Sequence, residues 1–252
     1  MHDSKATYYP EARLVWQKKA EIEPYVLFYQ VDIVTNLIEG KLFFISSTTG
    51  ELINSYSLST KCTATSSATN FYGNRSFFTK QVNVPGIGNT YSLWNDCNIA
   101  FIHTLRFNDS TDYYSVNNTW SQNSSPATSH WAAQQAASYF LNVHQRLSWN
   151  NLNAGCYVYQ RLGWDNASAL SGNIIIGEAN SISYRDDNNT LDIVAHEYAH
   201  LVTETSAGLV YKKEQGALNE SFSDIFGVAC YEFNFGITNT IWLNGYDRTD
   251  VT

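Results

Sequence analysis

Residues 196–200 read His-Glu-Tyr-Ala-His, an H-E-x-x-H pattern that constrains this chain more than any other feature. On an α-helix, side chains four positions apart project from one face, so His196 and His200 can bind one metal ion together. Zinc accepts imidazole nitrogen, and a catalytic zinc site keeps one coordination position open for water. Glu197 is placed to take a proton from that water. The flanking apolar residues indicate a buried helix, which we expect over residues 191–205.

A second helical pattern begins at Gly216 and carries two carboxylates. Glu220 is a natural third ligand, because two histidines and one carboxylate are a common ligand set in hydrolytic zinc sites. Asp224 lies one helical turn later, where it can accept the second ring N–H of a zinc-binding histidine. The alternative is a solvated acidic face beside a helix with two ordinary hydrogen-bonded histidines. With six histidines in the whole chain, a chance H-E-x-x-H match is improbable, and the two patterns together favour a zinc site.

The rest of the sequence indicates the fold class. Short alternating runs of apolar and polar residues between about residues 61 and 173 indicate a β-rich half, and residues 173–178 read as a strand bordering a cleft. Helices are expected near residues 130–147, 191–205 and 216–233. We therefore expect an α+β protein in which a β-rich N-terminal half meets the zinc-site helices at a cleft.

The run from Asp192 to Gly227 resembles the zinc helices of the thermolysin family of zinc metalloendopeptidases. The spacing from the second histidine to the glutamate agrees with the helix-loop-helix of that family, and residues 129–148 resemble its long N-terminal-domain helix. Together the matches cover roughly residues 60–252. The resemblance implies that the chain hydrolyses peptide bonds in peptide or protein substrates with one zinc ion.

The resemblance also implies catalytic roles, residue by residue. His196, His200 and Glu220 would be the zinc ligands. Glu197 would be the general base, which takes a proton from the attacking water and later passes it to the leaving amine. Tyr211 would help to stabilise the oxyanion of the tetrahedral intermediate.

Four further residues match supporting positions of the family. Asp224 would hold the first zinc-binding histidine, and Asn219 would brace the second helix. Asn166 and Ala167 match the edge segment whose backbone aligns the substrate as an added strand. These roles, like the catalytic ones, are implied by the resemblance.

Two departures from the family change what we expect. Aromatic residues normally follow the Asn-Ala pair, whereas this chain has Ser168 and Ala169, which changes or opens a wall of the cleft, so the side-chain preferences of the family do not carry over. In the calcium site near the zinc helices, Asp192 matches one acidic ligand, but Tyr231 and Tyr246 stand where others are expected. Because calcium requires many oxygen ligands, we expect this calcium site to be absent or much weakened.

The N-terminal part of the sequence predicts a small sheet. Residues 25–33 and 41–46 read as strands, and a Thr-Gly-Glu turn at residues 49–51 leads into a further strand. The pattern resembles the PepSY-type end of a thermolysin-like propeptide, and the alternative is a small antiparallel sheet without that role. We expect three parts in the chain: a propeptide segment over 1–58, a β-rich peptidase domain over 59–190 and the zinc-site helices, as the start of a truncated helical domain, over 191–252.

The family continues beyond the zinc helices with a helical stretch that supplies the far wall of the cleft and a transition-state histidine. In this sequence no histidine follows His200. We therefore expect a truncated precursor that lacks one donor to the developing oxyanion and hydrolyses peptides poorly. Two alternatives are a catalytically crippled zinc-binding protein and a non-enzymatic binding or inhibitory module.

Composition excludes several other classes of protein. The 252 residues carry a formal net charge of −8 and no cluster of lysine and arginine, which argues against nucleic-acid binding. No stretch reaches transmembrane length. Residues 1–17 lack the apolar core of a secretory signal, so secretion is implied by the resemblance alone. Four cysteines lack metal-binding spacing and could form disulfides in three pairings: Cys62, Cys97, Cys156 and Cys230.

Overall fold

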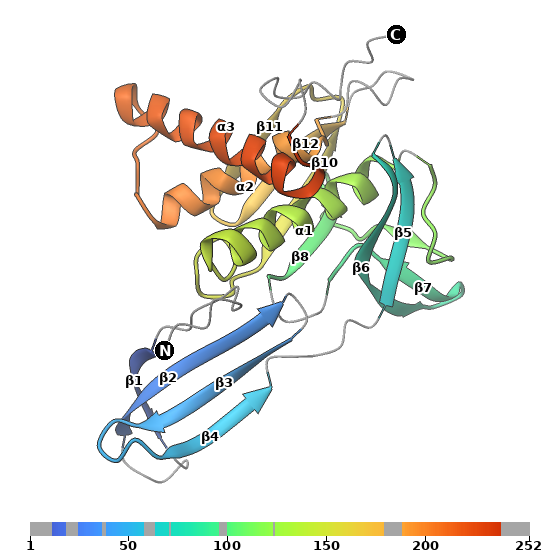
Figure 1. Cartoon of the computed structure of the whole chain (residues 1–252). Helices are drawn as coiled ribbons and strands as arrows, with labels where there is room; N and C mark the ends of the chain where they lie inside the picture. Colours follow the sequence, from blue (N-terminus) through green and yellow to red (C-terminus); the bar gives the residue numbers. More distant parts are fainter. Residues whose placement is uncertain are drawn as a thin grey trace.

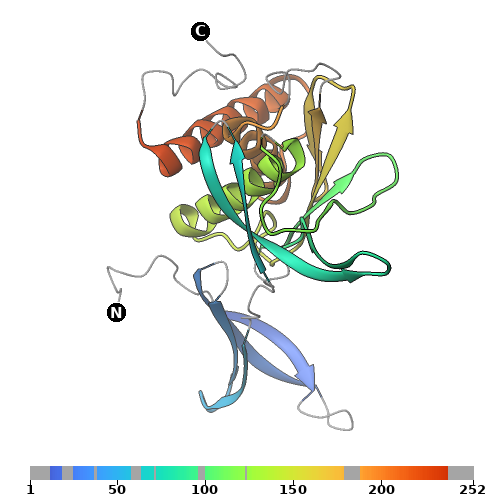
Figure 2. The ribbon, with the colours of Figure 1, turned by 90° about the vertical axis from the view of Figure 1, so that its right-hand side faces the viewer.

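The computed structural model describes residues 12–18, 25–36, 39–57, 64–70, 72–95, 100–122, 124–178 and 188–237. These residues form three four-stranded sheets and three helices, which confirms the expected α+β class (Figure 1). Two of the sheets lie with the helices in one body. The N-terminal sheet stands apart from that body in both views (Figure 1 and Figure 2).

The N-terminal sheet is an antiparallel meander in sequence order: β1 (Ala12–Lys18), β2 (Tyr25–Asn36), β3 (Glu39–Ser46) and β4 (Leu52–Ser57). The two strands predicted over residues 25–33 and 41–46 are confirmed as parts of β2 and β3. The predicted turn joins β3 to β4, and the Ser46 N–H donates to the Glu51 carbonyl oxygen across it at 2.9 Å. Arg13 connects this sheet to the main body, because its Nη2 donates to the Asn151 carbonyl oxygen at 3.1 Å.

The main body contains one antiparallel and one mixed sheet. The antiparallel sheet has the order β5 (Ala64–Asn70), β6 (Gly73–Val84), β7 (Gly88–Ser92) and β9 (Tyr114–Ser115). The mixed sheet has the order β11 (Ala167–Leu170), β12 (Asn173–Glu178), β10 (Cys156–Leu162) and β8 (Ile102–Arg106). In the mixed sheet β8, β10 and β12 are parallel, and β11 is the antiparallel strand at the edge.

Three helices complete the body: α1 (Ser125–His144), α2 (Leu191–Thr205) and α3 (Lys213–Phe235). Helix α2 has the predicted bounds, and α3 contains the predicted helix with additional residues at both ends. Helix α1 is displaced toward the N-terminus relative to the prediction. Pro126 lies in its first turn, where a backbone N–H has no hydrogen-bond partner within the helix, so the missing N–H of proline removes no helical hydrogen bond. Gln145 ends the helix in the left-handed conformation with a φ of 54°.

The core lies between the mixed sheet and helices α1 and α2. The sheet contributes fully buried side chains from alternate positions of its strands: Ile102, Val158, Ile174 and Ile176. The helices contribute the alanines of α1 together with larger side chains: Phe140, Val194, Tyr198 and Leu201. Because α2 is buried in this core, the metal-ligand pattern that it carries is held on a rigid element.

Two of the four cysteines fall within the described residues. Cys156 and Cys230 are buried free thiols, so neither forms one of the disulfides that the sequence allowed. Cys62 and Cys97 lie outside the described residues. In the part of the chain that the structure describes, no helix has the length and apolar character needed to cross a membrane.

Helices α2 and α3 approach each other closely at Gly227. A Cβ atom at this position would lie 2.6 Å from the Asp192 carbonyl oxygen and 3.4 Å from the His196 Cβ. A side chain larger than hydrogen would therefore push α3 away from the helix that carries the H-E-x-x-H pattern.

We predict that Gly227→Ala destabilises the protein by about 1–3 kcal/mol, because the added methyl group overpacks the contact between the helices. This loss should occur even though alanine is about 1 kcal/mol better than glycine inside a helix. Urea unfolding measures the change. Ser221→Ala, at an exposed position of the same helix, is the control and should stay within about 0.5 kcal/mol of the parent. An equally stable Gly227→Ala protein would contradict the close approach.

Candidate metal centre

Two histidines on α2 and one glutamate on α3 converge where these helices lie side by side (Figure 1). The Nε2 atoms of His196 and His200 are 2.9 Å apart. Glu220 Oε2 lies 3.3 Å from His196 Nε2, and Glu220 Oε1 lies 3.6 Å from His200 Nε2. The ligand atoms of the three residues lie within 4.8 Å of one another. The three residues predicted to bind zinc are therefore brought together in space.

The second ring nitrogen of each histidine has its own partner on α3. His196 Nδ1 lies 2.9 Å from Asp224 Oδ1, and His200 Nδ1 lies 2.8 Å from Asn219 Oδ1. A carboxylate only accepts hydrogen bonds, so His196 Nδ1 carries the hydrogen, and in the neutral ring Nε2 keeps its lone pair. Burial, followed by the nearby His200, lowers the pKa of His196 and favours that neutral ring.

This donor set fits a divalent metal ion. Two imidazole nitrogens with lone pairs face each other at 2.9 Å, and a carboxylate faces both of them. Such a set of acceptors repels itself unless a cation or a proton lies between its members. Two histidines and a carboxylate with one side left open are also the ligand set of hydrolytic zinc sites.

Ser223 also contacts one of the two histidines, and the sequence did not lead us to expect this contact. Its buried Oγ lies 3.0 Å from His200 Nδ1. The sequence held a signal for it, because Ser223 follows Asn219 by four positions and so shares its helix face. The Asn219 side chain contacts His200 directly, and its expected role in bracing the second helix stays a prediction.

Glu197 directly follows the first of the two histidines on α2 and is buried. Only 6% of its surface is exposed. Its Oε2 atom has no hydrogen-bond partner among the described residues. Burial, and to a lesser extent the charge of Glu220, raise the pKa of Glu197 to about 8. A carboxylate in this environment binds a proton more strongly than a solvated one, which is the property that a general base needs.

Tyr211 lies in the connection between α2 and α3 and is 69% exposed. Its hydroxyl donates a hydrogen bond to Glu220 Oε1, and this bond, with burial a smaller cause, raises the pKa of Tyr211 to about 12. The tyrosine therefore remains a neutral donor at physiological pH. The hydrogen bond to Glu220 connects Tyr211 to the candidate metal ligands.

Asn166 and Ala167 lie at the start of edge strand β11. The Asn166 carbonyl oxygen accepts the Gly177 N–H at 2.8 Å, and the Ala167 N–H is held by Asn166 Oδ1 at 2.9 Å. Gly177 is required here, since a Cβ at this position would lie 1.9 Å from the Trp164 carbonyl oxygen. Helix α2 packs against β11, so the edge strand and the metal centre belong to one unit.

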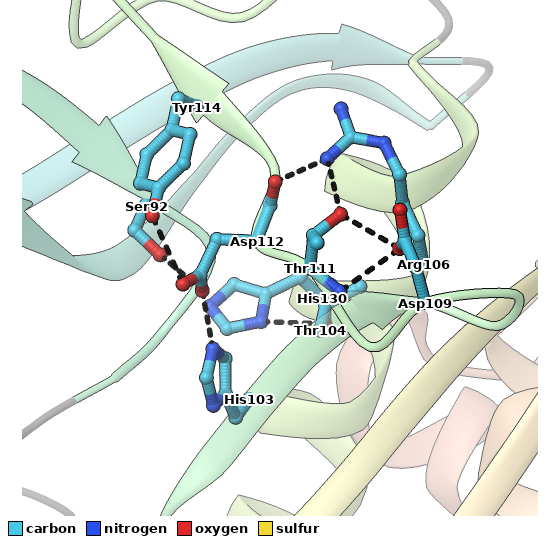
Figure 3. Close-up of polar contacts among 9 residues, drawn as sticks. All are labelled: Ser92, His103, Thr104, Arg106, Asp109, Thr111, Asp112, Tyr114 and His130. Atoms are coloured by element: carbon cyan, nitrogen blue, oxygen red, sulfur yellow. Dashed lines mark hydrogen bonds and ion pairs between the residues drawn. The ribbon is translucent and has the colours of Figure 1, made fainter. Parts of the chain in front are cut away.

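The other described histidines have structural partners. His103 Nε2 lies 2.5 Å from Asp112 Oδ1, and the buried His130 bonds to Thr104 Oγ1 at 2.9 Å (Figure 3). His144 Nε2 lies 2.9 Å from the Tyr139 hydroxyl. Among the described residues, the cluster on α2 and α3 is the one group with the arrangement of a metal site.

The region expected to hold a weakened calcium site is aromatic. Tyr231 packs against Tyr72 and Phe235, with ring centroids 6.3 and 4.9 Å apart. Asp192 is buried, and its Oδ1 accepts the Ile193 N–H at 2.9 Å. Tyr246 lies outside the described residues. The loss of calcium affinity stays a prediction.

Comparison with known proteins gives two family matches. Residues 65–204 match the catalytic domain of thermolysin metallopeptidase, and residues 207–250 match its alpha-helical domain. Bacillolysin from Brevibacillus brevis is 32% identical over 249 residues, which are 94% of this chain and 44% of that protein. An extracellular metalloprotease from Pectobacterium carotovorum subsp. carotovorum is 39% identical over 74 residues, 29% of this chain and 21% of that protein.

A solved structure, the precursor of the metalloproteinase protealysin from Serratia proteamaculans, aligns with 53% of this chain and 43% of its own. The TM-score of 0.42 and the identity of 22% are too low to define a common fold. This chain spans less than half the length of the curated relatives that it matches. The catalytic-domain match covers more than half of the chain. The chain therefore belongs to the thermolysin family of metallopeptidases.

Proposed function

We propose that this chain carries the zinc centre of a metalloendopeptidase that cleaves internal peptide bonds of peptide or protein substrates. The convergence of two imidazole acceptors and one carboxylate, with the buried Glu197 beside them, is the observation that carries the proposal. The ligands would be His196, His200 and Glu220. A zinc ion bound there would polarise the attacking water and the scissile carbonyl.

The protein's own residues then perform the proton transfers. Glu197 takes a proton from the attacking water and delivers it to the nitrogen of the leaving amine, so that the carboxylate is regenerated. Burial raises the pKa of this carboxyl, so its carboxylate accepts a proton more readily than a solvated one. Asp224 and Asn219 contact the Nδ1 atoms of the two histidines and would thereby hold each ring with its Nε2 free for the metal.

Two further groups would act on the substrate. The Tyr211 hydroxyl, which donates to Glu220 in this structure, would turn to donate to the oxyanion of the tetrahedral intermediate. Asn166 and Ala167 would align the substrate backbone along β11 as an added strand.

We further propose that the N-terminal sheet is the end of a propeptide and that the enzyme is a secreted zymogen. The sheet stands apart from α2 and α3 (Figure 1), and one of its links to the main body is the hydrogen bond from Arg13 to Asn151. The Pectobacterium relative, whose name places it outside the cell, supports secretion.

The proposed ligand set implies a fixed ratio of zinc to protein. The purified chain should bind about one zinc ion per molecule, measured by elemental analysis after dialysis. His200→Ala should lose most of this zinc, and Asp224→Ala should weaken zinc binding by about 10- to 100-fold in a chelator competition. His144→Ala, which alters a histidine with a structural partner, is the matched control and should keep its zinc. Absence of zinc that does not recover when zinc is added would refute the ligand assignment.

The role of Glu197 can be separated from metal binding. In a full-length version of the protein, Glu197→Gln should keep its zinc but lose peptidase activity by about 10²-fold or more, because the base is removed and the ligands remain. Glu214→Gln, at an exposed position in the first turn of α3, is the control and should retain activity. Cleavage of a protein substrate and zinc content are measured on the same samples. An active Glu197→Gln enzyme would show that another group is the base.

A further inference from the structure

A pocket of about 450 Å³ lies on the face of the mixed sheet that points away from α1 and α2. Side chains alternate between the faces of a strand. Ile174 and Ile176 of β12 point to the helices and are buried, so Ile175 points to the opposite face. The pocket is lined there by Phe107, Tyr159 and Ile175 and, on the edge strand, by Ser168 and Leu170.

The aromatic wall of this pocket is fixed. The rings of Phe107 and Tyr159 meet edge to face, with centroids 6.3 Å apart and an interplanar angle of 90°. The Phe107 N–H donates to the Gln160 carbonyl oxygen at 3.0 Å. The turn that carries Phe107 is closed by Asp109, whose Oδ1 accepts the Thr111 N–H at 3.0 Å and the Thr111 hydroxyl at 2.8 Å (Figure 3). The pocket is therefore preformed, and a ligand would not have to order its wall.

The other wall belongs to the edge strand where the substrate is proposed to bind. Residues directly opposite each other on neighbouring strands present their side chains on the same face. A peptide added along β11 would therefore place alternate side chains beside Ser168 and Leu170, on the pocket side. The small side chain of Ser168 leaves the route from the added strand to Ile175 open. Leu170 is 70% exposed, which leaves a large apolar surface at the rim.

The position of β11 relative to the metal centre is also fixed. Ser171, in the turn between β11 and β12, donates from its N–H and its hydroxyl to the Glu204 carboxylate of α2 at 2.9 and 3.1 Å. Glu204 and the two metal-binding histidines lie on the same helix. When a peptide pairs with β11 and its scissile bond lies at the proposed metal centre, its register is set, and only certain positions of the peptide can reach the pocket.

We infer that this pocket binds one large apolar side chain of the substrate, aromatic or branched aliphatic, at a position that points away from the metal centre. The chemistry of the lining supports this class of side chain, because none of the lining residues carries a charge. The inference rests on the proposed peptidase function and adds a determinant of substrate preference to it.

The test uses the full chain as its zinc-loaded Glu197→Gln variant, so that peptides bind without being cleaved. The probes are blocked alanine-rich peptides with one phenylalanine moved through every position, and their affinities are measured by calorimetry. Phenylalanine at one position, or at two positions that alternate along the peptide, should increase the affinity by about 10- to 100-fold. This is the gain in affinity expected when one large apolar side chain is buried. Adding Ser168→Trp, which fills the pocket, or Leu170→Asp, which charges its rim, should abolish that gain.

Leu162→Asp is the matched control. Leu162 is 66% exposed at the end of β10 and does not line the pocket, so this variant should keep the preference for phenylalanine. Zinc content and thermal unfolding show that each variant is folded and loaded. Equal binding of all peptides, or a preference that survives both pocket substitutions, would overturn the inference and leave the proposed function standing. Failure of the folded, zinc-loaded chain to bind any peptide would instead reject the proposed function, and the inference with it.

Discussion

The close contact of α2 with α3 is the constraint on which the rest of the site depends. The histidines of one helix reach the carboxylate of the other because Gly227 lets the two backbones approach. Glu220 lies about two helical turns before this glycine, so a wider separation there would move its oxygens away from both imidazoles. Asn219, Ser223 and Asp224 are on the same helix and would move with it. One contact therefore sets both the ligand distances and the orientation of the rings.

The site is electrostatically costly for a protein to hold without a cation. It places two acceptor nitrogens and the Glu220 carboxylate within 4.8 Å of one another, and the same Glu220 charge, after burial, raises the pKa of the neighbouring Glu197. A bound divalent ion would replace this repulsion with attraction, because positive charge stabilises each of these groups. Metal binding and the stability of the α2–α3 pair should therefore be coupled.

Local patterns in the sequence were sufficient to select the three residues that converge in the candidate metal centre. Helix α2 was predicted with its observed bounds because its apolar residues recur with helical period around the H-E-x-x-H pattern. Helical spacing likewise placed Glu220 and Asp224 on one face. The extra first turn of α1 was missed although Pro126 is a start signal, because the apolar run that marks the helix becomes clear later in the chain.

Features that depend on pairing between distant segments could not be predicted. The parallel pairing of β8 with β10, and of β10 with β12, joins segments that no local pattern connects. The pocket on the outer face exists because Phe107, Tyr159 and Ile175 come from three segments brought together by that pairing. The hydrogen bond from Tyr211 to Glu220 depends on the path of the loop between the helices, which the sequence pattern does not define.

A group of aromatic residues shows how this chain holds α2 and α3 together. The first N–H groups of a helix need acceptors from outside it, and the side chain of Thr190 provides none to α2. The Tyr72 hydroxyl accepts the Leu191 N–H at 2.8 Å, while its ring stacks on Phe235 at the end of α3 with centroids 5.0 Å apart. One side chain thus connects the start of α2 to the end of α3. Tyr231 packs into the same group, so aromatic contacts hold the two helices together at these ends.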